Sequence, residues 1–141
     1  MRPDKACRVW GDETMTRLFF TVIAVISALY GLAFLAIPEL LGQFYGAKPD
    51  DPNAYLNIRF FGSALFSLGL IYWFARDFTD RGAARAVLTA SLVSNILGVV
   101  LNVWAATGGL LNSLAWSSAA IQLFLALWAL RCLQAGVREP A

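Results

Sequence analysis

The sequence predicts an all-α integral membrane protein: a bundle of four transmembrane helices with both termini in the cytoplasm. Of its 141 residues, 59% are hydrophobic and 14% are charged, whereas a soluble domain has about 25% charged residues. Residues 18–38 and 86–130 contain no charged residue. Each of these runs is long enough to cross a hydrocarbon core, which needs about 20 helical residues. The basic residues are also divided unequally among the segments that flank the apolar runs.

The first two spans are predicted at 18–38 and 56–75, because both are continuous apolar runs rather than the alternating pattern of a membrane barrel. The charge-free run 18–38 is 21 residues long, which exceeds the roughly 7–15-residue core of a signal peptide. Residues 1–17 are predicted as a cytoplasmic tail. Met1 and Met15 are both adequate starts, since Met15 directly precedes the first span.

The third and fourth spans come from a single charge-free run, 86–130. At 45 residues it is too long for one crossing and must fold back on itself. Paired glycines interrupt helices, so we expect the turn at Thr107-Gly108-Gly109. The spans then cover about 86–106 and 110–130. The transmembrane domain is 18–134, and a cytoplasmic tail follows at 135–141.

The distribution of basic residues predicts the orientation of the bundle. Nine of the eleven lie on the side of the termini and of the connection between spans two and three: Arg2, Lys5, Arg8, Arg17, Arg76, Arg81, Arg85, Arg131 and Arg138. Only Lys48 and Arg59 lie on the other side. The positive-inside rule therefore predicts a multi-pass membrane protein with both termini on the cytoplasmic side. No basic stripe with interleaved aromatic residues points to nucleic acid.

Histidine and the common catalytic sequence motifs are missing from the sequence. It contains no histidine, the commonest general base and metal ligand. Cys7 and Cys132 lie far apart and form no C-x-x-C pair. No nucleotide-binding glycine motif occurs, and no carboxylate lies inside a predicted span. These features favour a protein that is not an enzyme, with no metal site and no required cofactor.

Six polar residues within or beside the spans form the candidate site: Arg59, Glu39, Asn57, Asn102, Asn95 and Gln122. A rise of about 1.5 Å per residue predicts an outer polar layer of Arg59, Asn57 and Asn102, and a central layer of Asn95 and Gln122. Glu39, at the outer end of span one, is placed to pair with Arg59. These residues either bind a ligand or serve structural roles, with Arg59 reaching water at the interface and the amides joining helices.

Small residues recur at helical spacing in three spans, as Gly62 and Gly69; Ala90, Ser94 and Gly98; and Ala115 and Ala119. Such spacing allows close approach of helix backbones, within the bundle or to a partner. The connection at 42–55, GQFYGAKPDDPNAY, is the longest one. It is either an ordinary loop or a docking surface.

The stretches YGLAFLAIPELLGQFYG and NIRFFGSALFSLGLIYWFAR resemble those of the DoxX-like family of small bacterial four-helix membrane proteins. The matching positions are Pro38, Gly46, Arg59, Gly62 and Gly69. The resemblance implies an integral four-helix bundle of a bacterial inner (cytoplasmic) membrane, sometimes associated with respiratory or oxidoreductase complexes.

The leading hypothesis is a non-catalytic accessory subunit of a larger bacterial membrane complex, packed through apolar helix faces against other integral subunits or copies of itself. A groove facing a lipid, a quinone or a pigment is compatible with it. The alternative is a small oligomeric carrier for an anionic or amphipathic solute, in which Arg59 binds the substrate. A further alternative is a membrane enzyme acting on a lipid or quinone, with Glu39 or Tyr30 as acid or base.

Overall fold

The computed structural model describes residues 3–46 and 52–137, with side chains over 13–46 and 53–135. Within these ranges the chain is helical, with five helices: α1 (Pro3–Ala36), α2 (Pro38–Phe44), α3 (Pro52–Ala75), α4 (Arg81–Thr107) and α5 (Leu114–Val137). Four of them contain segments long and apolar enough to cross a membrane: Glu13–Ala36, Asn53–Ala75, Arg81–Thr107 and Leu114–Ala135. The predicted all-helical class and the four long apolar helices are confirmed.

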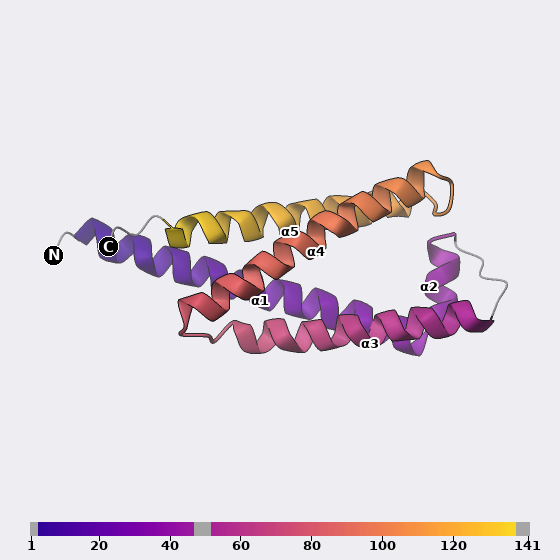
Figure 1. Cartoon of the computed structure of the whole chain (residues 1–141), viewed down its shortest axis with the longest axis horizontal. Helices are drawn as coiled ribbons and strands as arrows, with labels where there is room; N and C mark the ends of the chain where they lie inside the picture. Colours follow the sequence, from indigo (N-terminus) through magenta and orange to yellow (C-terminus); the bar gives the residue numbers. More distant parts are fainter. Residues whose placement is uncertain (1–2, 47–51, 138–141) are drawn as a thin grey trace.

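The four long helices form two hairpin-like pairs. α1 packs mainly against α3, and α4 packs mainly against α5, while contacts between the pairs are few (Figure 1). The first turn of α1, the last turn of α5 and the α3–α4 connection lie at one end, called here the terminal end. The short helix α2 and the α4–α5 turn lie at the opposite end, called the α2 end. Consecutive long helices therefore alternate in direction, as four spans require.

Glycine residues allow the backbones of α1 and α3 to come into direct contact. A Cβ placed on Gly62 would lie 2.8 Å from Phe34 Cβ and 2.9 Å from the Gly31 carbonyl oxygen. One placed on Gly69 would lie 2.9 Å from the Ala28 backbone nitrogen. The predicted small-residue positions Gly62 and Gly69 thus serve packing within the chain, where small side chains allow helices to approach closely.

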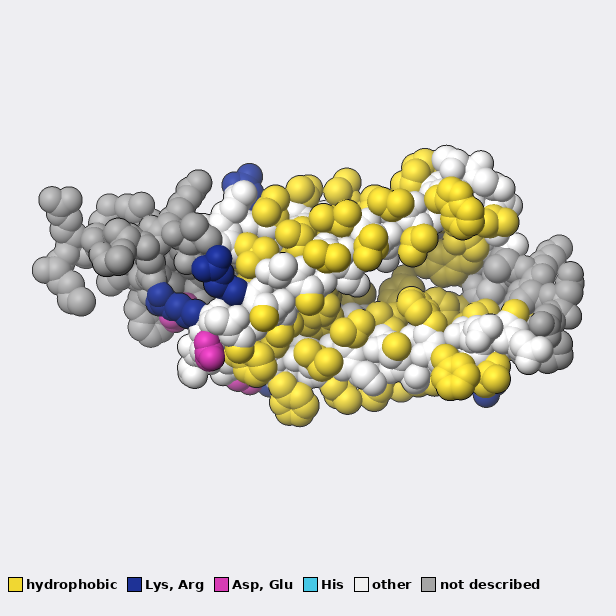
Figure 2. Space-filling model, in the orientation of Figure 1, with side chains coloured by type: hydrophobic (Ala, Val, Ile, Leu, Met, Phe, Trp, Pro, Cys, Tyr) yellow, Lys and Arg dark blue, Asp and Glu magenta, His cyan; other side chains and the backbone are white. Residues whose placement is uncertain are grey.

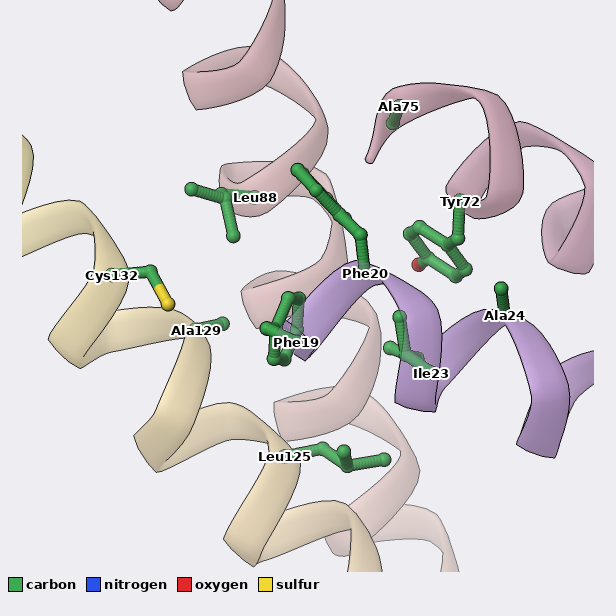
Figure 3. Close-up of a cluster of buried hydrophobic side chains, with 10 residues drawn as sticks. All are labelled: Phe19, Phe20, Ile23, Ala24, Tyr72, Ala75, Leu88, Leu125, Ala129 and Cys132. Atoms are coloured by element: carbon green, nitrogen blue, oxygen red, sulfur yellow. The ribbon is translucent and has the colours of Figure 1, made fainter. Parts of the chain in front are cut away.

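A cluster of buried side chains joins the two helix pairs at the terminal half of the molecule (Figure 3). It draws residues from all four long helices: Phe19, Phe20, Ile23, Ala24, Tyr72, Ala75, Leu88, Leu125, Ala129 and Cys132. Phe19 is fully buried and meets Trp128 edge to face, at 5.7 Å between ring centroids. Phe20 stacks with Tyr72 at 6.4 Å. The Phe19–Trp128 contact joins the two pairs, whereas the Phe20–Tyr72 contact lies within the α1–α3 pair.

Large apolar side chains also cover much of the outside of the long helices (Figure 2). Phe74 is 67% exposed, Trp104 64% and Leu29 63%. In water such exposure costs about 25 cal/mol for each Å² of apolar surface. A hydrocarbon environment removes that cost, so the surface agrees with helices that cross a membrane.

Helical structure extends beyond the predicted spans. The predicted tail 1–17 is helical from Pro3 onward as part of α1. The short helix α2 was not predicted, and it starts at Pro38, where proline is favoured because its missing N–H is not needed in a first turn. Residues 47–51 of the predicted connection, including Lys48, lie outside the described ranges.

The predicted turn between spans three and four is confirmed, but it is longer than expected. α4 ends at Thr107, and Gly109 adopts φ +70°, a conformation that favours glycine. α5 then begins at Leu114 rather than 110. The later start of α5 has a physical cause. Asn112 Oδ1 accepts a hydrogen bond from the Leu114 backbone N–H at 3.0 Å and so helps begin the helix at this residue.

Asp80 caps the start of α4 by accepting hydrogen bonds from the backbone N–H groups of Gly82 (2.7 Å) and Ala83 (3.3 Å). Replacing a capping aspartate with alanine typically costs about 1 kcal/mol. We expect Asp80→Ala to lower the unfolding free energy by that amount in detergent titrations. Thr79→Ala, one residue earlier, is the control and should leave it unchanged; equal losses would exclude the cap as the cause.

Candidate functional site

A groove of about 610 Å³ lies between the two helix pairs. The hollow is visible in Figure 2 between the upper and lower halves of the molecule, toward the α2 end. Its walls are mostly apolar and come from all five helices, with Ile26, Phe61, Leu68 and Leu97 among them. This volume falls in the range of about 300–1,000 Å³ that is typical of small-molecule sites.

The fold closes this groove at both ends. Toward the terminal end, Tyr72 and Leu125 belong both to the buried cluster and to the groove lining. At the α2 end, the Tyr45 and Ser118 hydroxyls lie 2.9 Å apart in a hydrogen bond that joins the end of α2 to α5. The groove therefore has the buried cluster as its boundary at one end and this hydrogen bond at the other.

Asn112 adds a second tie at the α2 end. Its side-chain Nδ2 donates to the Phe44 carbonyl at 2.8 Å, and its backbone N–H donates to the Tyr45 carbonyl at 2.9 Å. The α4–α5 turn is thereby fastened to the end of α2. Sequence inspection did not single out Asn112 for this role, because its partners lie more than 60 residues away.

Among the described residues, nine polar side chains line the otherwise apolar groove: Ser27, Tyr30, Tyr45, Tyr72, Ser94, Asn95, Asn102, Ser118 and Gln122. No charged side chain of the described residues lines it. The groove is therefore suited to a neutral molecule, because burying an unpaired charge in such a site would be costly.

Two of the predicted site residues form a direct contact between α4 and α5. Asn102 Nδ2 donates to Gln122 Oε1 at 3.1 Å and also to the Gly98 carbonyl at 2.9 Å. The Gln122 side chain lies against Gly98, where an added Cβ would come within 2.5 Å of it. The small residue Gly98 thus makes room for a polar side chain of the neighbouring helix.

Asn95 is buried and bonds within its own helix. Its Nδ2 donates to the Ser91 carbonyl at 2.8 Å and to Ser91 Oγ at 3.3 Å. No hydrogen bond to its Oδ1 is found among the described residues. Because Asn95 lines the groove, that oxygen is an acceptor available to a bound molecule.

The structure separates the six predicted site residues into two groups. Asn95, Asn102 and Gln122 line the groove. Arg59, Asn57 and Glu39 are exposed and do not line it.

Two predicted arrangements are wrong. Within the described ranges no ion pair joins Glu39 to Arg59. The two polar layers are also different, because Gln122 pairs with Asn102 instead of sharing a level with Asn95. The prediction placed each residue at a depth in the membrane by counting residues from the end of its predicted span. Which residues meet depends instead on where each helix starts and on the angle at which the helices cross.

The sequence did not predict that tyrosines line the groove. Tyr30, predicted only as an acid or base of an enzyme, lines the groove, as does Tyr45. Polar side chains on the first helix, Ser27 and Tyr30, are the signal in the sequence that could have marked this wall of the groove.

Within the described ranges, no cluster of three or more histidine, cysteine or acidic residues could hold a metal ion.

Comparison with protein families gives one match, to a domain of unknown function, DUF8292, over residues 4–134. The chain belongs to the DUF8292 family. This DUF8292 protein has no match among curated proteins or solved structures. Its resemblance to DoxX-like proteins stays a prediction.

Proposed function

We propose that this chain is a non-catalytic accessory subunit of a membrane protein complex, and that its groove holds a neutral amphipathic molecule of the quinone or neutral-lipid class. The observation that carries the proposal is the groove itself, with apolar walls, a line of uncharged polar groups and no charged lining residue. An elongated apolar molecule would lie along the walls, and its carbonyl or hydroxyl groups would meet the polar side chains.

Two amides and two hydroxyl groups supply the recognition chemistry. Asn95 Oδ1 is an available acceptor, and the Tyr30 and Tyr45 hydroxyls both donate and accept hydrogen bonds. Asn102 fixes the Gln122 side chain from one side, which holds its amide in place at the groove wall. A site of few fixed polar groups in an apolar cleft is typical of orientation-specific binding.

The carrier centred on Arg59 receives less support from this arrangement. Arg59 is exposed on α3 and does not line the groove, so an anionic solute bound there would not contact Asn95, Asn102 or Gln122. Glu39 is likewise outside the groove. We therefore propose a neutral occupant.

A groove-filling substitution tests the binding proposal. Ser94 lines the groove, whereas Ala90, one turn earlier on α4, does not, and both are exposed. We expect Ser94→Trp to reduce the quinone or neutral lipid that co-purifies with the protein by at least about tenfold, since the indole occupies its space. Solvent extraction and mass spectrometry of the purified protein would measure this. Ala90→Trp should retain the molecule.

Either of two results would contradict the binding proposal: no neutral amphipathic molecule in the wild-type extract, or equal losses in both tryptophan variants. The accessory role has a separate test. Native electrophoresis of mildly solubilised membranes should show the chain migrating with other integral subunits at a fixed ratio. Migration as a lone homo-oligomer would exclude that role and leave the groove result intact.

A further inference from the structure

A second pocket, of about 480 Å³, lies at the terminal end of the molecule, apart from the groove. It is formed by α1, the α3–α4 connection, the start of α4 and the end of α5. Among the side chains that the structure describes, six charged ones line it: Arg17, Arg76, Arg81, Arg85, Glu13 and Asp77. Four arginines against two carboxylates give this described part of the lining an excess of positive charge.

One carboxylate is shared between two of these arginines. Asp77 Oδ1 lies 3.1 Å from Arg17 Nη2, and Asp77 Oδ2 lies 3.1 Å from Arg76 Nε. Each guanidinium carries five N–H donors. A single carboxylate can neutralise only one of the two charges, so the pair keeps both charge and donors for an anion.

Arg76 is also held in place from its other side. Its guanidinium carbon lies 3.5 Å from the centre of the Trp73 ring, and its side chain is only 24% exposed. Stacking on an aromatic face and the bond to Asp77 together restrict the arginine side chain. Such a prearranged guanidinium favours phosphate, whose oxygens accept two N–H bonds at once.

The floor of this pocket is apolar, and it includes the buried residues Phe20, Ala75, Leu88 and Cys132. A charged rim above an apolar floor matches a phosphate group joined to glycerol and acyl chains better than it matches a free inorganic ion. The N–H groups of Gly82 and Ala83 at the start of α4 already bond to Asp80, so these two backbone groups are not available to an anion.

We propose that this pocket binds the phosphate of an anionic phospholipid. Basic pockets between transmembrane helices on the cytoplasmic side are suited to acidic lipid headgroups. The pocket lies at the end that the positive-inside rule predicts to face the cytoplasm. Arg17 and Arg76 would contact the phosphate, and Arg81 and Arg85 of α4 would supply further positive charge. This proposal is independent of the groove and its occupant.

The test compares lipid binding to the full chain in mild detergent by native mass spectrometry. The probes are phosphatidylglycerol and phosphatidylcholine with identical acyl chains. We expect wild-type protein to bind phosphatidylglycerol more tightly, and Arg85→Gln to weaken that binding about fivefold, since one arginine near an anionic lipid surface contributes about 1 kcal/mol. Arg85→Lys should retain most of it.

Arg131→Gln is the matched control, because Arg131 is an exposed arginine of α5 outside the pocket. It should leave phosphatidylglycerol binding unchanged. An equal loss in Arg131→Gln would overturn the proposal, because it would show only a general attraction between charges. Equal binding of the two lipids to wild-type protein would overturn it whatever the variants do. Displacement of phosphatidylglycerol by millimolar inorganic phosphate would overturn the lipid assignment and indicate a soluble anion.

Discussion

Replacing Gly62 with leucine is expected to lower the unfolding free energy of the protein by about 3 kcal/mol, at the upper end of overpacking effects. An added Cβ at this position would lie 2.8 Å from Phe34 Cβ and 2.9 Å from the carbonyl oxygen of Gly31. The second atom belongs to the backbone, so it cannot move away by a change of rotamer. α1 and α3 would have to separate along their length.

Gly62→Ala gives a sharper form of the same experiment. Alanine is favoured over glycine within a helix by about 1 kcal/mol, so without the contact to α1 the variant should be more stable than the wild type. The contact predicts the opposite sign, with a loss smaller than that of Gly62→Leu. Unfolding by increasing sodium dodecyl sulfate in mild detergent, followed by tryptophan fluorescence, would measure both.

The neighbouring residue is the control for this series. Ser63 is exposed, and its hydroxyl bonds to the Phe60 carbonyl of its own helix. Ser63→Leu adds bulk to α3 on an outward-facing position and should change the unfolding free energy little. A gain in stability in Gly62→Ala, or an equal loss in Ser63→Leu, would show that the close α1–α3 contact does not hold in the protein.

The second large effect is expected at Phe19, the fully buried ring where α1 meets α5. Phe19→Ala removes the edge-to-face contact with Trp128 and leaves a cavity among side chains from all four long helices (Figure 3). Substitutions of this kind cost about 3–5 kcal/mol. The loss should appear as a lower midpoint in the same unfolding titration.

Phe74→Ala is the matched control for Phe19→Ala, because Phe74 on α3 is 67% exposed. It removes the same atoms from a side chain that packs on little of the protein. A small change there and a large one at Phe19 would support the buried cluster as the main junction of the two helix pairs. Similar changes at both positions would contradict it.

The sequence alone predicts much of the fold because the physical signals involved are local or compositional. Long charge-free runs mark the four apolar helices, and paired glycines mark the turn after Thr107. Glycine positions on α3 were predicted to allow close contact, and the structure supplies their partners on α1. α2 was missed because a seven-residue helix after Pro38 has too little periodicity to be distinguished from a loop.

The candidate site was predicted only in part. Asn95, Asn102 and Gln122 were chosen because polar groups inside apolar spans are rare, and all three line the groove. Arg59 was chosen for the same reason, but the rotation of α3 places it outside the groove. The contribution of Tyr45 and Ser118 depends on a contact between residues 73 positions apart, which a periodicity argument does not reveal.

By itself the sequence determines that the chain is helical and that four segments are long and apolar enough to cross a membrane. It also determines that most basic residues lie toward the two ends of the chain and between the second and third apolar segments. These properties follow from the transfer energies of side chains and from the hydrogen-bonding demands of the backbone, which depend on each segment alone. Only the tertiary structure decides which helices pair, where the pairs diverge and which polar groups face the groove. Helix rotation and crossing depend on side-chain packing between distant segments.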